Sequence, residues 1–250
     1  MTELLVAVVA GFGAGLMNSV VGAGTLISFP AMLAIGLPPL SANVTSAVGI
    51  FPGNVSAAWT YRAVLRRPEM RSISRLATFA IVAGAFMGVP LLLLIPPAVF
   101  SAVVPWLILT AGLLTLAQPW IARAFNKPQG GSQPRRFVIV LGLTLAGIYL
   151  SYFGAATGVV VISALLYAGI SDLQAVNAVK NFAVGIANTV VAVVFIFVAP
   201  VNIPIAAMLA LGALAGGYIG GRSAQRLSPT LFRIVIVAVA LLAAALSFVN

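Results

Sequence analysis

The chain has 250 residues, of which 62% are hydrophobic and 6% are charged, and its mean hydropathy is +1.18. Because a soluble domain carries roughly a quarter of its residues charged, this composition excludes a soluble globular protein and predicts one surrounded by lipid. The formal net charge is +10, with three acidic residues and neither Cys nor His. The usual metal ligands and acid–base groups are therefore scarce, and we expect no cofactor.

Apolar stretches separated by Gly, Pro and short charged loops predict ten helical segments. They cover residues 4–18, 24–36, 41–62, 74–95, 97–118, 136–153, 158–169, 172–198, 202–221 and 229–249. Most are long enough to cross the membrane, which takes roughly 20 helical residues, but the second and seventh are too short. Each of these follows a break of small residues, so we interpret the first two segments, and the sixth and seventh, as broken or re-entrant helical pairs.

The basic residues predict how the chain is oriented. Five of the 13 lie between residues 62 and 75, four between 123 and 136, and three between 222 and 233. Cytoplasmic loops carry an excess of Lys and Arg, so all three loops should be cytoplasmic. This places both termini outside and predicts a multi-pass protein of a bacterial inner membrane. The same distribution indicates membrane topology rather than a surface that binds nucleic acid.

The two halves of the chain resemble each other. The stretch 83–88 (AGAFMG) matches 215–220 (AGGYIG) at an offset of 132 residues. Other matches have an offset of 134: Gly13 with Gly147, Gly24 with Gly158, Asn43 with Asn177, and Asn54 with Asn188. Five segments per half is an odd number, so the second copy should be inverted, as in many secondary transporters. We predict an all-α polytopic fold with a first inverted repeat at 1–125, a cytoplasmic linker at 126–135 and a second repeat at 136–250.

Glycine pairs on two of the predicted segments indicate close helix packing. Gly84 and Gly88 lie in segment 74–95, and Gly216 and Gly220 lie at the matching positions of segment 202–221. Small residues four apart let two helix backbones approach each other within a membrane. We therefore assign these glycines to packing rather than to chemistry.

Lys180 is the one basic residue outside the three loops, eight positions into segment 172–198. A charge at that depth costs several kcal/mol unless it faces a cavity or a partner, which makes it a functional candidate. Helical spacing places it on one side of the segment with three asparagines. The resulting polar stripe is Asn177, Lys180, Asn181 and Asn188, and the matching stripe on segment 41–62 is Asn43, Ser46 and Asn54.

The two short segments offer further groups for binding an anion near the midplane. They begin at glycines, so their first N–H groups should be unpaired, and helix N-termini carry a partial positive charge. The residues concerned are Gly22, Gly24, Thr25, Thr157 and Gly158. Since no acidic residue lies in the predicted membrane core, these donors and Lys180 predict an anion site. The alternative is that Lys180 bonds to helix-end carbonyls or extends toward the cytoplasmic side.

These residues also carry a resemblance to a known family. The stretch 21–30 (VGAGTLISFP), followed by 42–46 (ANVTS), resembles the first repeat of the sulfite exporter TauE/SafE family. The stretch 177–181 (NAVKN), with Asn188 downstream, is similar to the second signature of that family. The resemblance covers nearly the whole chain. It implies a transporter or facilitator that exports sulfite, sulfonates or related organic anions across the inner membrane.

Two other functions stay open on the sequence. An intramembrane enzyme would use a Ser–Lys pair, such as Ser46 with Lys180, as nucleophile and base, and it would also need a water path. A non-transporting membrane scaffold would need neither broken helices nor a buried Lys. We expect a protein that is not an enzyme and whose partners are a small anion and the lipid bilayer. The sequence leaves the oligomeric state undecided.

Overall fold

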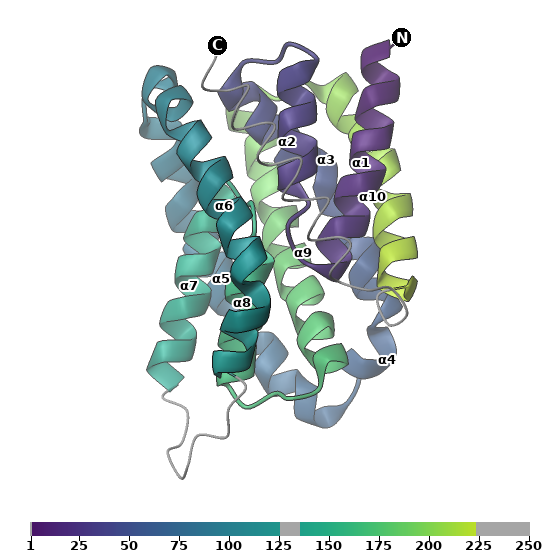
Figure 1. Cartoon of the computed structure of the whole chain (residues 1–250), viewed down its shortest axis with the longest axis vertical. Coiled ribbons are helices and arrows are strands. Elements are labelled where there is room, and N and C mark those ends of the chain that lie inside the picture. Colours follow the sequence, from purple (N-terminus) through teal and green to yellow (C-terminus); the bar gives the residue numbers. More distant parts are fainter. Residues whose placement is uncertain (1, 126–135, 224–250) are drawn as a thin grey trace.

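A computed structural model of the protein describes residues 2–125 and 136–223, and in those ranges the regular structure is entirely helical (Figure 1). The helices are α1 (Thr2–Val20), α2 (Thr25–Ala34), α3 (Pro39–Thr60), α4 (Arg62–Leu65), α5 (Pro68–Leu94), α6 (Pro97–Phe125), α7 (Arg136–Tyr152), α8 (Thr157–Tyr167), α9 (Leu173–Val198) and α10 (Ile203–Ser223). The predicted all-α class is confirmed. The predicted linker 126–135 and segment 229–249 lie outside the described residues.

Five of the described helices, α1, α5, α6, α9 and α10, are long and apolar enough to cross a membrane. Helix α3 has 22 residues but is less apolar, because it carries the asparagines of one predicted polar stripe. Helices α2, α7 and α8 are shorter and apolar. The chain is thus a multi-pass membrane protein in which the most polar long helix must be shielded by its neighbours.

Local sequence explains most helix boundaries. Helices α3 and α5 begin with Pro39 and Pro68, since proline fits the first helical position, where no N–H partner is needed. Asp172 caps α9 by accepting from the Gln174 N–H at 2.9 Å. Helix α5 begins six residues before the predicted segment, because the apolar run marks its lipid-facing part whereas the helix continues into the charged end with Arg71. Helix α6 similarly extends beyond the predicted residue 118.

The predicted close packing at the glycine pairs is confirmed. A Cβ atom added to Gly84 would lie 2.0 Å from the carbonyl oxygen of Thr144, and one added to Gly216 would lie 2.0 Å from that of Phe12. Helix α5 therefore touches α7 backbone to backbone, and α1 touches α10 in the same way. A side chain at either glycine would force the helices apart.

The glycine contacts also fix the repeat register on the first helix of each half. Gly15 packs on α10 through Ala213, and Gly147 packs on α5 through Ile81. Gly147 follows Gly15 by 132 residues, and Ala213 follows Ile81 by the same number. The predicted pairing of Gly13 with Gly147, and of Gly24 with Gly158, is therefore wrong by two residues. The offset becomes 134 at the starts of α3 and α9, because α8 and the turn after it are each one residue longer than their counterparts.

Helix directions follow from contacts at the two ends of the molecule. Ser41 Oγ, near the start of α3, donates to the carbonyl oxygen of Pro200, just before α10, at 2.8 Å. At the other end Arg67, before α5, pairs with Asp172, before α9, at 3.8 Å. Helices α1, α3 and α10 run one way, whereas α5, α7 and α9 run the other way (Figure 1). These directions support inverted repeats, and the inversion across a membrane stays a prediction.

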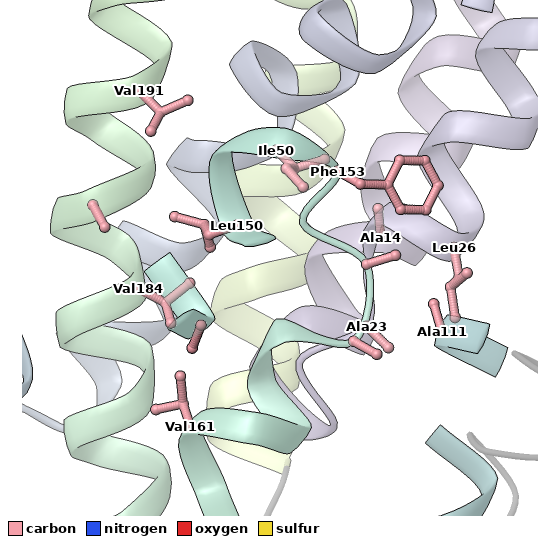
Figure 2. Packing of buried hydrophobic residues seen from close by; sticks show 14 of the residues in the cluster. Ala14, Ala23, Leu26, Ile50, Ala111, Leu150, Phe153, Val161, Val184 and Val191 are labelled. Atoms are coloured by element: carbon pink, nitrogen blue, oxygen red, sulfur yellow. The ribbon is translucent and has the colours of Figure 1, made fainter. Parts of the chain in front are cut away.

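Buried apolar side chains surround the two breaks. Figure 2 shows Ala23 of the first break and Phe153 of the second among residues of the core such as Leu150 and Val184. The Phe153 ring meets Phe29 edge to face, with 5.2 Å between the ring centroids. Helices that carry mostly Ala, Gly and Val at their contacts can approach closely, and this brings both breaks to the centre of the molecule.

Candidate functional site

The two helix breaks meet directly. The Gly158 N–H donates to the carbonyl oxygen of Gly22 at 3.1 Å. A Cβ atom on either glycine would lie 2.4 Å from the Cα atom of the other, and Gly22 has a φ of +81°. The crossing therefore requires glycine at both positions, for space at each and for backbone conformation at Gly22.

A small pocket lies beside this crossing, and eight of the twelve predicted site residues line it. These are Gly22, Thr25, Asn54, Thr157, Gly158, Lys180, Asn181 and Asn188. The other lining residues are Asn18, Ala47, Ile50, Leu150, Phe153, Gly154 and Val184. The pocket thus combines both breaks with the middle of α3 and of α9. None of its lining residues in the described part of the chain is acidic.

Lys180 is buried, with 1% of its surface exposed. Its Nζ donates to the carbonyl oxygens of Asn18 at 3.1 Å and of Ser19 at 3.2 Å, and Asn181 Nδ2 donates to the Ser19 oxygen as well, at 3.2 Å. These contacts match the alternative in which Lys180 bonds helix-end carbonyls, here those of α1. An ammonium group has three N–H donors, so one remains for the pocket that Lys180 also lines.

Asn54, which lines the pocket, has an unused donor. It is 1% exposed, and its Nδ2 has no hydrogen-bond partner among the described residues. Its Oδ1 accepts from Asn18 Nδ2 at 2.6 Å, and Asn18 Oδ1 accepts from the Gly24 N–H at 3.3 Å. This chain of bonds connects the first break to the Asn54 amide.

Asn18 was missed in the sequence analysis. It lies in an apolar segment four residues before Gly22 and is buried. The signal was available, since a polar residue at membrane depth is a functional candidate by the same argument as Lys180. It is not part of either predicted stripe, and for that reason the helical periodicity did not reveal it.

Four predicted residues do not line the pocket. Asn43 Nδ2 donates to the carbonyl oxygen of Tyr152, the last residue of α7, at 3.0 Å. Ser46 Oγ bonds to Ser28 Oγ, the Gly24 N–H is bonded to Asn18, and Asn177 Oδ1 is buried without a partner among the described residues. Asn43 therefore closes the end of α7 much as Lys180 and Asn181 close the end of α1.

Two expectations about this site need correction. The first N–H groups at the glycines are not unpaired, because Gly24 and Gly158 both donate within the protein. Helices α2 and α8 instead begin at Thr25 and Thr157, whose N–H groups have no partner inside their own helices. In addition, Ser46 is bonded to Ser28 rather than to Lys180, so the Ser–Lys pair of the enzyme alternative is not formed.

Comparison with known proteins identifies the family of this chain. The family model described as Sulfite exporter TauE/SafE matches residues 7–247. The chain belongs to the TauE/SafE family. This TauE/SafE chain is 29% identical over 239 residues to a probable membrane transporter protein, ORF9, of Sinorhizobium sp, which covers 93% of this chain and 88% of the relative. It is 27% identical over 233 residues to a probable membrane transporter protein of Haemophilus influenzae, covering 91% and 87%. It is therefore a multi-pass membrane protein of a transporter family.

Proposed function

We propose that this protein exports a small anion, namely sulfite, a sulfonate or a related organic anion, across a bacterial inner membrane. The anion binds in the pocket at the crossing of the two helix breaks. Membership of the TauE/SafE family supports transport of this class. The observation that carries the proposal is Lys180, a buried lysine in a pocket whose described lining has no carboxylate.

The positive charge of Lys180 favours a negatively charged ligand. The partners of the Lys180 ammonium group are two neutral carbonyl oxygens at the C-terminus of α1. The partial negative charge of a helix C-terminus stabilises a nearby cation. Neither carbonyl carries a formal negative charge, and an anion beside the third N–H would supply one.

Neutral donors complete the anion site. Asn54 Nδ2 supplies two N–H groups that bond to no described residue, and Asn188 lines the same pocket. Thr25 and Thr157 place the N-termini of α2 and α8 against it, where helix dipoles favour negative charge. Asn43 and Ser46, by contrast, hold the surrounding helices together.

The first test changes the charge of the pocket in two ways, by removing the Lys180 cation or by adding a carboxylate at position 54. Lys180→Met should lose sulfite binding and sulfite flux in liposomes, because a charged hydrogen bond is worth roughly 1.5–3 kcal/mol. Lys180 also bonds the carbonyl end of α1, so its replacement changes the structure there as well. A second variant therefore tests the pocket independently. Asn54→Asp keeps the oxygen that accepts from Asn18 but adds a carboxylate to the pocket, and it should reduce sulfite affinity at least as strongly.

Gln174→Glu is the matched control, because it makes the same change from amide to carboxylate at an exposed position of α9. Sulfite affinity and flux should stay at the wild-type level in this variant. If both single variants, Lys180→Met and Asn54→Asp, fold and keep wild-type sulfite flux, the anion does not use this pocket.

A further inference from the structure

A second hollow lies at one end of the molecule, where α3, α4 and α10 meet. It is lined by Trp59, Thr60, Arg62, Ala63, Arg66, Tyr218 and Arg222, and we call it the arginine groove. It shares no residue with the pocket at the helix breaks. It contains three arginines, and none of the three acidic residues of the chain lines it. The groove therefore attracts negative charge.

Aromatic rings hold two of the guanidinium groups without neutralising them. The Arg62 guanidinium lies 5.2 Å from the centroid of the Trp59 ring and also donates to the Trp59 carbonyl oxygen at 3.1 Å. The Arg222 guanidinium lies 5.0 Å from the Tyr218 ring centroid. Cation–π contacts position a cation without using its N–H groups, and Arg62 gives only part of its five N–H groups to Trp59. Guanidinium forks suit phosphate oxygens in particular.

An apolar strip continues from the groove along the same two helices. Val55 lies four residues before Trp59 on α3, and Leu214 lies four residues before Tyr218 on α10, so each shares a helix face with its aromatic neighbour. Val55 is 47% and Leu214 is 49% exposed. The two helices are in contact here, since Ser56 Oγ donates to the Leu214 carbonyl oxygen at 2.9 Å.

We propose that the arginine groove binds the phosphate headgroup of an anionic phospholipid, whose acyl chain lies along Val55 and Leu214. A free phosphate ion would use the arginines alone, whereas a lipid uses both the charged groove and the strip below it. The aromatic residues fit this depth, because Trp and Tyr gather where headgroups meet hydrocarbon. Basic pockets between transmembrane helices are known to hold anionic headgroups.

The test measures ligand-dependent thermal stabilisation of the full-length protein in a neutral detergent. Phosphatidylglycerol should raise the unfolding midpoint in a saturable way, whereas phosphatidylcholine and inorganic phosphate at equal concentrations should not. In Arg62→Gln/Arg222→Gln the apparent affinity for phosphatidylglycerol should fall at least tenfold. Arg71→Gln/Arg75→Gln removes the same charge from exposed positions on α5, outside the groove, and should keep the wild-type affinity.

A single Arg66→Gln variant covers the case in which the double variant does not fold, and it should also weaken phosphatidylglycerol binding. The proposal is overturned if phosphatidylcholine stabilises as well as phosphatidylglycerol, or if inorganic phosphate reproduces the whole effect. It is equally overturned if the two double variants lose affinity to the same extent, since that would indicate diffuse attraction to a basic end rather than a site.

Discussion

Two asparagines and one lysine form the centre of the site, and each has a distinct task. Lys180 closes the carbonyl end of α1 while lining the pocket. Asn54 lines it with an amide whose Nδ2 bonds to no described residue. Asn18 bonds to Asn54 and to the Gly24 N–H, so it positions both the donor and the first break. A polar side chain that acts through another one is as important to this geometry as a direct ligand.

Asn18 therefore gives a prediction at the residue scale. Asn18→Asp keeps an acceptor for the Gly24 N–H but loses the donor to Asn54, whose amide should turn its Nδ2 toward the new carboxylate. The Asn54 donor would then be taken up by this carboxylate rather than by the anion, and the carboxylate would line the same pocket. Sulfite affinity should therefore fall by at least about tenfold, the effect of one or two lost hydrogen bonds. Isothermal titration with sulfite measures this.

Ser19→Ala is the neighbouring control for Asn18→Asp. The Ser19 hydroxyl bonds to the Leu16 carbonyl oxygen within its own helix, whereas the carbonyl that Lys180 uses belongs to the main chain and is retained. Sulfite affinity should be unchanged. Equal affinity in Asn18→Asp and Ser19→Ala would remove Asn18 from the positioning role.

At the scale of elements, the molecule is assembled by exchange between its halves. Helix α1 packs on α10 and α7 packs on α5, so the first helix of each half lies against a long helix of the other half. These contacts are made by backbone atoms, because glycines occupy the crossing points. The two breaks meet only if both pairs pack at this distance, which links helix packing to the geometry of the site.

Two glycines on α1 test this packing. A Cβ atom on Gly15 would lie 2.3 Å from the carbonyl oxygen of Ala213, whereas one on Gly13 would lie 3.5 Å from the nearest atom, in the Ile27 side chain. Gly15→Ala should destabilise the protein by about 1–3 kcal/mol, the usual cost of overpacking. Gly13→Ala should be neutral or slightly stabilising. Reversible unfolding in detergent, followed by circular dichroism, compares them, and equal midpoints would contradict the close approach of α1 and α10.

At the scale of the whole molecule, the described arginines gather at one end. They lie on α4 and directly after it, in the first part of α5, at the start of α7 and near the ends of α6 and α10. Helix directions bring these ends together, in agreement with the loop charges that predict a cytoplasmic face. The turn after α8 lies at this end through the pair of Arg67 with Asp172, whereas the equivalent turn after α2 lies at the other end, near Pro200.

Cysteine labelling can decide the inversion, because the chain has no cysteine of its own. We expect Ser171→Cys, in the turn after α8, to react with a membrane-impermeant maleimide only from the cytoplasm. Pro38→Cys, in the turn after α2, should react only from outside. Glu69→Cys serves as the reference for the basic end and should follow Ser171→Cys. Labelling of Ser171→Cys and Pro38→Cys from the same side would refute inverted repeats.

The sequence by itself determined the helices, the two breaks and the unusual position of Lys180. These depend on local properties, namely apolar runs, Gly and Pro positions, and the cost of a charge inside a membrane. From these local properties, eight of the residues that line the pocket could be predicted.

Only the tertiary structure decided which polar side chains face the pocket and which close helix ends. Asn43 and Asn54 lie on one predicted stripe, yet Asn43 bonds to Tyr152 and Asn54 faces the pocket. The carbonyl partners of Lys180 and the positioning role of Asn18 were likewise beyond the sequence. The physical reason is that these bonds join residues far apart in the chain, or follow from the register in which two helices pack, and periodicity within one helix carries no information about either.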